Sequence, residues 1–210
     1  MNLIGLIISF AFLIVAMTTH EFAHGWVAYK LGDNTAKYSG RLTLNPLAHI
    51  DLMGTIILPL ALFIATSGRF IFGAAKPVPV NYWTLKNPRR DMMLVGAAGP
   101  LANFVFAYIL VLAWRFLPPS QLLNFILQNL IYINVVLGVF NLIPIPPLDG
   151  SRIVSGLLPA EISNEYSKIE PYGFYIILIL VWLNIFQIFV LPVVNLILKI
   201  MTAPLLGASF

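Results

Sequence analysis

The chain has 210 residues, of which 60% are hydrophobic and 10% are charged, and its mean hydropathy is +0.91. Because soluble domains contain about 45–50% apolar residues, this composition excludes a soluble globular protein and indicates a chain that crosses the lipid bilayer several times. The net charge of +4 comes from basic residues in short loops, which favours anionic lipid over nucleic acid as a partner, and the absence of cysteine excludes disulfides and cysteine-bound zinc.

The first predicted helix runs from Leu3 to Leu31 and carries the pattern H-E-x-x-H at positions 20–24. Two histidines four positions apart lie on one face of a helix, so His20 and His24 can bind one zinc ion. The residue between them, Glu21, can reach a zinc-bound water and is the candidate catalytic base. A chance pattern at a polar helix end is the alternative, but ionisable side chains are costly at membrane depth.

The pattern becomes irregular after the first helix. The residues from Ala36 to Asp51 are mixed and polar, and we expect a small extended hairpin there rather than a helix. The apolar segment from Leu52 to Thr66 is short for a membrane span, which needs about 20 residues. A stretch rich in Gly, Pro and Arg follows from Ser67 to Asp91 and contains the apolar fragment Phe70 to Ala75.

Two long apolar segments come next, predicted as helices over Met92 to Phe116 and Leu122 to Ile143. The first opens with Gly-Ala-Ala-Gly-Pro at positions 96–100, whose small side chains let another helix approach closely. The last apolar block, Tyr172 to Met201, is expected to break at Pro192. The predicted fold class is all-α: one domain over residues 1–210, a bundle of about five to six transmembrane or re-entrant helices with a small hairpin after the first.

The positions of Lys and Arg predict the orientation in the membrane. None occurs before Lys30, whereas the later loops carry most of them. Basic loops favour the cytoplasmic side, so the N-terminus is expected outside the cell (inner) membrane. His20 lies about 25 Å along the first helix from Leu3, at 1.5 Å per residue, so the histidine pair is expected toward the cytoplasm.

A catalytic zinc site needs a third protein ligand. The candidates are Asp33, Asp51, Asp91, Asp149, His49 and the three glutamates between positions 161 and 170. Asp149 is favoured, because nearby prolines and a glycine unwind the chain after a helix and let the carboxylate project into a cavity. The pair His49 and Asp51 is the runner-up, and the alternative for Asp149 is a role as helix N-cap.

The pairing of H-E-x-x-H with N-x-x-P-x-x-x-L-D-G at positions 141–150 resembles the site-2 protease family of intramembrane zinc metalloproteases, in a short form without a PDZ domain. The run at positions 96–103 is similar to the glycine-rich segment of that family. The resemblance implies one Zn²⁺ ion bound by His20, His24 and Asp149. It also implies that Glu21 is the catalytic base.

Two asparagines are candidates for contact with the substrate. The resemblance implies that Asn141 helps to hold the substrate backbone. Asn103 is an equal candidate for substrate binding and for a hydrogen bond between helices, a common use of Asn in membranes.

The expected activity is hydrolysis of peptide bonds within or near transmembrane segments of membrane proteins, as in regulated intramembrane proteolysis. A zinc transporter and a non-proteolytic membrane protein are the competing interpretations, and Glu21 distinguishes them, because a transporter needs no acid–base group between two ligands.

A helical substrate must be unwound before cleavage, and the stretch from Ala36 to Asp51 could pair with it as an added strand. For the ligands to share one depth, Leu52 to Ala75 must enter and leave the membrane on the same side as a re-entrant hairpin.

Overall fold

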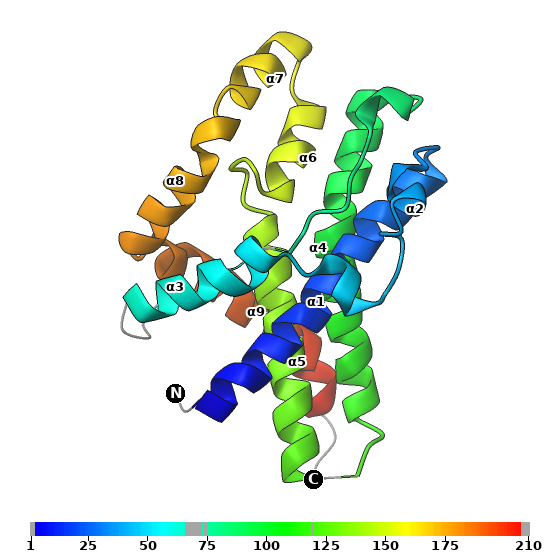
Figure 1. The fold of residues 1–210 in the computed structure, drawn as a ribbon. Helices are drawn as coiled ribbons and strands as arrows, with labels where there is room; N and C mark the ends of the chain where they lie inside the picture. The colour runs from blue at the N-terminus through cyan, green and yellow to red at the C-terminus, as the bar shows by residue number, and fades with distance from the viewer. Residues whose placement is uncertain (1–2, 66–72, 74, 119, 207–210) are drawn as a thin grey trace.

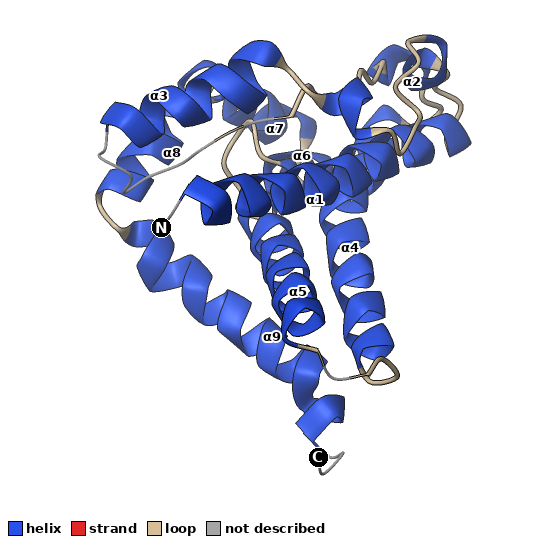
Figure 2. Ribbon diagram, turned by 60° about the horizontal axis from the view of Figure 1, so that its bottom comes forward, coloured by secondary structure: helices blue, strands red, loops and turns tan. Residues whose placement is uncertain are grey.

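The computed structural model describes residues 3–65, 73, 75–118 and 120–206, and all regular structure in that part of the chain is helical (Figures 1 and 2). Three helices there are long and apolar enough to cross a membrane, namely α1 (Leu3–Lys30), α4 (Pro88–Trp114) and α5 (Gln121–Asn141). A fourth span results if α8 (Glu170–Trp182) and the helix after it, bent by 77°, are counted as one. The all-α class and the membrane location are confirmed, whereas the expected count of helices is not.

The three long helices form the centre of the bundle. α4 and α5 pack side by side in opposite directions, and α1 crosses both at an oblique angle (Figure 1). α1 and α5 both run upward in Figure 1. The C-terminal parts of α1 and α5 therefore lie toward the same end of the bundle, as shared metal ligands require.

An apolar core and an apolar outer surface both stabilise this bundle in lipid. The buried side chains of Val111, Val135 and Val194 join α4, α5 and α9 (Leu191–Leu206). On the outside of α4, Leu101 and Val105 lie four residues apart, and each is more than half exposed. Exposed apolar side chains at helical spacing are what contact with lipid requires.

The extended hairpin expected between Ala36 and Asp51 is not found. This segment instead contains the short helix α2 (Thr35–Tyr38) and the 3₁₀ turn η1 (Pro46–His49). The side chain of Asn45 accepts a hydrogen bond from the backbone N–H of Leu47, and Pro46 occupies the first helical position. Such local side-chain bonds compete with strand pairing, so they favour a turn here.

The two ends of the segment between residues 50 and 75 lie next to each other. It begins with a π-helical turn, η2 (Leu52–Ile57), and α3 (Leu58–Ala65), which extend away from α4 in Figure 1. The backbone N–H of Lys76 donates to the carbonyl oxygen of His49 at 2.9 Å, so both ends of the segment are joined. Most of the predicted fragment Phe70 to Ala75 lies outside the described residues, so the re-entrant hairpin expected over Leu52 to Ala75 stays a prediction.

The C-terminal block breaks earlier than the sequence predicts. α6 (Asp149–Leu157) and α7 (Ala160–Ser167) lead into α8, and the chain bends at Asn184, whose φ is 58°. The break expected at Pro192 is therefore wrong. Pro192 is the second residue of α9, in the first turn after the π-helical turn η4 (Phe186–Val190), where a missing N–H is tolerated.

Candidate metal centre

The side chains of His20, His24 and Asp149 converge on one point inside the bundle. Nε2 of His20 lies 2.9 Å from Oδ2 of Asp149 and 3.0 Å from Nε2 of His24, which is 3.2 Å from the same oxygen. All three residues are buried, with 5%, 4% and 5% of their surface exposed. Among the residues that the structure describes, they are the only group of three able to hold a metal ion together.

Each of the two histidines makes a hydrogen bond through Nδ1, which leaves its Nε2 facing Asp149. Nδ1 of His24 lies 2.7 Å from the backbone carbonyl oxygen of Val95, and Nδ1 of His20 lies 2.7 Å from Oδ1 of Asn103. Both partners are acceptors, so each Nδ1 carries the proton and donates it. In the neutral rings, both Nε2 atoms therefore present lone pairs to each other and to the carboxylate.

This donor set fits zinc. Three acceptor atoms with no hydrogen between them repel each other at about 3 Å, and a cation between them removes the repulsion. Tetrahedral zinc with bonds of about 2.0–2.2 Å keeps its ligand atoms about 3.3 Å apart. The observed separations of 2.9–3.2 Å need only a small outward movement to reach that spacing.

The small residues of α4 make the convergence possible. A Cβ atom on Gly99 would collide with Nε2 of His24 and lie 2.6 Å from Nε2 of His20, so only glycine leaves room for both rings. A Cβ atom on Gly96 would lie 2.9 Å from Cβ of Arg152 and 3.2 Å from the carbonyl oxygen of Asp149. The run at positions 96–100 thus lets α1 and α6 approach α4 from two sides, which confirms the close helix approach predicted from these small residues.

Asp149 is the first residue of α6, and its carboxylate does not cap that helix. Leu148 is the N-cap, with extended backbone, while the Asp149 side chain faces the histidines. Arg152, one turn later, places Nη1 at 3.7 Å from Oδ1 of Asp149. A Cβ atom on Gly150 would collide with the carbonyl group of Leu142, so this glycine lets the chain fold back after α5. The N-cap alternative for Asp149 is therefore wrong.

Glu21 is held in place by a backbone group of a distant segment. Its Oε2 accepts a hydrogen bond from the backbone N–H of Val78 at 2.8 Å, within the extended stretch that precedes η3 (Tyr82–Thr84). The Val78 side chain is buried against α1, where a Cβ atom on Gly25 would lie 3.1 Å from it. One carboxylate oxygen of Glu21 is thus fixed beside the histidine pair.

Asp33 anchors the same stretch and is not a metal ligand. Its two carboxylate oxygens accept hydrogen bonds from the backbone N–H groups of Thr35 at 2.9 Å and Asn81 at 2.7 Å. Burial alone would raise the pKa of Asp33, but hydrogen bonds from Thr35, Asn81 and Thr84 outweigh it and hold the pKa below its usual value. Glu21 within α1 and Asp33 just after its end therefore both fasten the 78–81 stretch beside the C-terminal part of α1.

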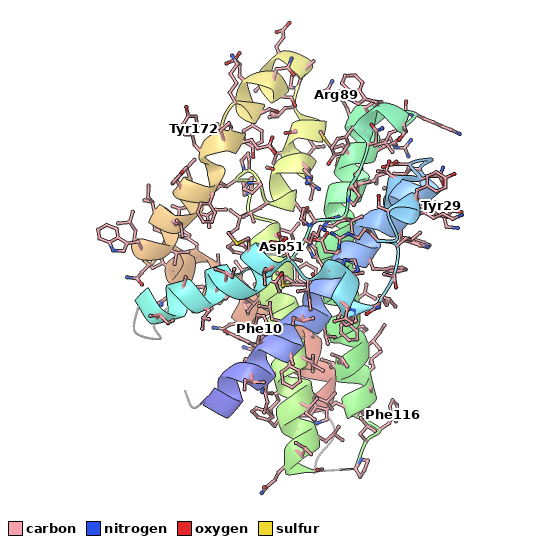
Figure 3. All side chains as sticks on the ribbon, viewed as in Figure 1. Phe10, Tyr29, Asp51, Arg89, Phe116 and Tyr172 are labelled. Carbon is pink, nitrogen blue, oxygen red and sulfur yellow. The ribbon has the colours of Figure 1, made fainter. Side chains whose placement is uncertain are left out.

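The other candidates for the third ligand lie elsewhere. Nε2 of His49 is hydrogen-bonded to the carbonyl oxygen of Thr43 at 2.8 Å. Asp51, labelled near the middle of Figure 3, accepts a hydrogen bond from the N–H of Gly54 at 2.7 Å. The runner-up pair is thus not brought to the histidines.

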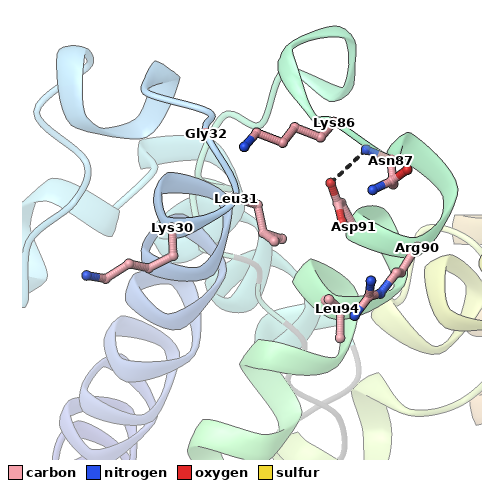
Figure 4. Close-up of a pocket in the computed structure, with 8 residues that line it drawn as sticks. All are labelled: Lys30, Leu31, Gly32, Lys86, Asn87, Arg90, Asp91 and Leu94. Carbon is pink, nitrogen blue, oxygen red and sulfur yellow. Dashed lines mark hydrogen bonds between the residues drawn. The ribbon is translucent and has the colours of Figure 1, made fainter.

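Asp91 is also turned away from the histidines. It accepts from the backbone N–H of Asn87 at 3.0 Å, beside a separate cavity of about 290 Å³ between the ends of α1 and α4. Lys30, Lys86 and Arg90 line this cavity with Asp91, and none of the three converging residues does (Figure 4).

The two asparagines named as substrate candidates differ in their surroundings. Asn103 is fully buried, and its side chain is hydrogen-bonded to His20, Ala16 and Asn134, so it has no donor left for a substrate. Asn141 is half-buried, and its Nδ2 donates to the carbonyl oxygen of Leu137, at 3.0 Å. Sequence reasoning missed Val95, whose backbone carbonyl leaves no mark in the sequence, and also Asn134, whose side chain bonds to Asn103.

The chain matches the family model described as Peptidase family M50 over residues 7–124 and 119–184. It is 44% identical over 177 residues to YwhC of Bacillus subtilis, covering 80% of this chain and 77% of that protein. It is 33% identical over 169 residues to Rip2 of Mycobacterium tuberculosis, covering 80% of this chain and 63% of that protein. Both relatives are named as candidate zinc metalloproteases. No solved structure matches the chain significantly.

Proposed function

Since this chain belongs to peptidase family M50 and is a zinc metalloprotease with membrane-spanning helices, we propose that it cleaves peptide bonds within or next to transmembrane segments of other membrane proteins. The observation that supports this proposal most strongly is the location of the metal centre. His20 and His24 lie inside α1, a helix able to span the bilayer, and they are buried against α4, a second such helix. A protease built in this way meets its substrates at membrane depth.

In the proposed site, His20, His24 and Asp149 would hold one Zn²⁺ ion, which when bound would polarise the substrate carbonyl and activate a water. Glu21 would take a proton from the attacking water and return it to the nitrogen of the leaving amine. The hydroxyl group goes to the carbonyl carbon as the peptide bond breaks, so one water is consumed for each bond. Val78 holds Oε2 of Glu21 at 2.8 Å, which leaves Oε1 as the oxygen for proton transfer.

Asn141 is the proposed contact for the substrate backbone. It ends α5, directly before the irregular loop that leads to Asp149, and it is half-buried. Its Nδ2 bonds to its own helix, so the amide oxygen is the group that would accept a hydrogen bond from an unwound substrate. An unwound substrate was considered as an added strand beside residues 36–51. That segment forms a short helix and a 3₁₀ turn, and no strand in the described structure, so the added strand is not part of this proposal.

The proposed orientation places the active site toward the cytoplasm of a cell membrane. The loop at α2, the loop before α4 and the connection from α6 to α7 gather at one end of the bundle, and the turn between α4 and α5 lies at the other (Figure 1). Cysteines introduced singly at Lys37, Lys86 and Ser120 test this arrangement, because the chain has no cysteine of its own. A membrane-impermeant thiol reagent applied from outside should label Ser120→Cys alone, and outside labelling of Lys86→Cys would contradict the proposed orientation.

The test of the function compares the wild type with Glu21→Gln in liposomes that contain a membrane-spanning substrate. Gln keeps the size of the side chain but removes the base, so the variant should keep its zinc and lose about 10²- to 10⁴-fold in turnover. Glu161→Gln, at an exposed position on α7, is the matched control and should cleave like the wild type. Undiminished cleavage by Glu21→Gln would contradict the mechanism, and zinc passage through a variant with no proteolysis would point to a transporter.

A further inference from the structure

Two fully buried asparagines connect the metal centre to the middle of α5. Asn103 on α4 and Asn134 on α5 each have 0% of their surface exposed. Nδ2 of Asn103 donates to Oδ1 of Asn134 at 2.8 Å and to the carbonyl oxygen of Ala16 at 3.0 Å. Oδ1 of Asn103 accepts from Nδ1 of His20 at 2.7 Å. One continuous set of hydrogen bonds thus joins α1, α4 and α5.

Two backbone carbonyl groups fix the direction of every bond in this set. Carbonyl oxygens only accept, so the one of Ala16 requires the NH₂ end of the Asn103 amide and turns its oxygen toward His20. Nδ2 of Asn134 donates to the carbonyl oxygen of Leu130 at 2.8 Å, so its own oxygen faces Asn103. With either amide reversed, two acceptors would face each other inside the bundle, at the cost of an unsatisfied buried group.

We propose that Asn103 and Asn134 are positioning residues for the zinc centre: together they hold the His20 proton on Nδ1 and the ring in the orientation that presents Nε2 to the metal. The proposal rests on the assignment of zinc to His20, His24 and Asp149. Asn134 touches neither the metal nor a ligand, and it acts by holding Asn103. The group that orients a metal-bound histidine through its second nitrogen is usually a carboxylate, a carbonyl or a water. Here it is the side-chain amide of Asn103, which Asn134 holds in turn.

The arrangement also explains why two polar side chains lie at this depth. A buried amide costs free energy in an apolar environment unless its groups are hydrogen-bonded. Each hydrogen of the Asn103 amide has an acceptor, and its oxygen has a donor. The same full use leaves no donor free for a substrate, so of the two uses considered for Asn103 the hydrogen bond between helices is the one we adopt.

The test uses Asn103→Leu, Asn134→Leu and the double variant, because Leu has a similar size, is apolar and makes no hydrogen bond. Asn129→Leu is the matched control: Asn129 lies on the same helix, and its Nδ2 donates to Phe125 at 2.8 Å, as that of Asn134 does to Leu130. Two quantities are measured in detergent: the zinc dissociation constant against a competing chelator, and the ring ¹⁵N signals of His20 in zinc-free protein. The chain has three histidines, so single replacements assign these signals.

We expect Asn103→Leu to raise the zinc dissociation constant about 10- to 100-fold and Asn134→Leu about 10-fold, the lower end of the range for such supporting residues. The ¹⁵N signals of His20 should shift from the Nδ1-protonated form toward a mixture in both variants and stay unchanged in Asn129→Leu. The double variant should bind zinc no more weakly than Asn103→Leu, because Asn134 acts through Asn103. A merely structural role would move the melting temperature without moving the His20 signals.

Four outcomes would overturn the proposal. Unchanged His20 signals in Asn134→Leu would show that Asn134 does not act on the ring. Independent, multiplying effects of the two replacements on zinc affinity would show that they do not act in sequence. A wild type that binds no zinc would refute the metal centre itself. If the wild type binds zinc and Asn134→Leu binds it with the same affinity, only the role of the two asparagines would be refuted.

Discussion

The glycine at the contact between α4 and the histidine pair offers a direct test of the metal geometry. In Gly99→Ala, the new methyl group would lie 2.6 Å from Nε2 of His20, whereas ordinary contacts begin at 3.4 Å. The His20 ring would then have to move by about 0.8 Å, the difference between those distances, and zinc tolerates only about 0.2 Å in its bonds. The same methyl group collides with Nε2 of His24. Both imidazole ligands would therefore be displaced at once.

The size of the effect follows from the strain. Extra methyl groups in a packed interior cost about 1–3 kcal/mol. If release of the metal relieves that strain, the zinc dissociation constant rises about 5- to 150-fold, since about 1.4 kcal/mol corresponds to a factor of ten. Peptide hydrolysis should fall at least as far, because a ligand misplaced by about 1 Å also disturbs the reacting geometry.

The assay measures zinc per chain, zinc affinity against a chelator and thermal melting for wild type, Gly99→Ala and Gly138→Ala. A methyl group at Gly138 on α5 would lie 2.8 Å from the ring of Phe104, the movable end of a side chain that is not part of the metal centre. Gly138→Ala should keep its zinc affinity even if it melts earlier. A zinc affinity for Gly99→Ala within twofold of wild type would refute the inferred contact between α4 and the imidazoles.

Three further predictions concern other parts of the chain. Asp149→Ala should lose zinc, measured as metal per purified chain, and full occupancy would reopen the case for His49 and Asp51. The folded pKa of Asp33 lies below the reference value of 3.8, so its hydrogen bonds stabilise the fold at neutral pH and this contribution is lost as the pH falls below about 4. Asp33→Asn should lower the free energy of unfolding by about 1–3 kcal/mol at pH 7 and weaken the pH dependence of melting. An unchanged melting curve would contradict the role of Asp33 as an anchor. Asn141→Leu should raise KM for a membrane-spanning substrate at unchanged zinc content, and an unchanged KM would remove Asn141 from substrate binding.

The ligands of the metal centre could be predicted from the sequence because each carries its own chemical signal. A histidine pair at helical spacing and an aspartate in a proline-rich loop are visible without a structure, and the structure brings His20, His24 and Asp149 together. The long helices were predictable for the same reason, since apolar length alone defines α1, α4 and α5. Their boundaries differ from the predicted ones by a few residues.

The parts that failed depend on local hydrogen bonds or on packing. Polar residues between Ala36 and Asp51 suggested strands, but Asn45 uses its side chain to hold a 3₁₀ turn. Pro192 suggested a break in the helix, but in the first turn of α9, after a π-helical turn, it does not interrupt the helix. The chain bends at Asn184 instead. In both places several structures satisfy the same residue pattern, and only the surrounding contacts select one.

The support of the metal centre could have been found by comparing two helices. On α1, Ala16, His20 and His24 are spaced four apart, and on α4 so are Val95, Gly99 and Asn103. The helices run in opposite directions, so His24 meets Val95 while His20 and Ala16 meet Asn103, with Gly99 between. Residues four apart share one helix face. Asn103 follows Gly99 by four residues, so its amide is on the face that Gly99 turns toward the histidines and can bond to His20. The α4 face is therefore the complement of the zinc-binding motif: Gly99 leaves room for both imidazoles, while Val95 and Asn103 hold their Nδ1 atoms.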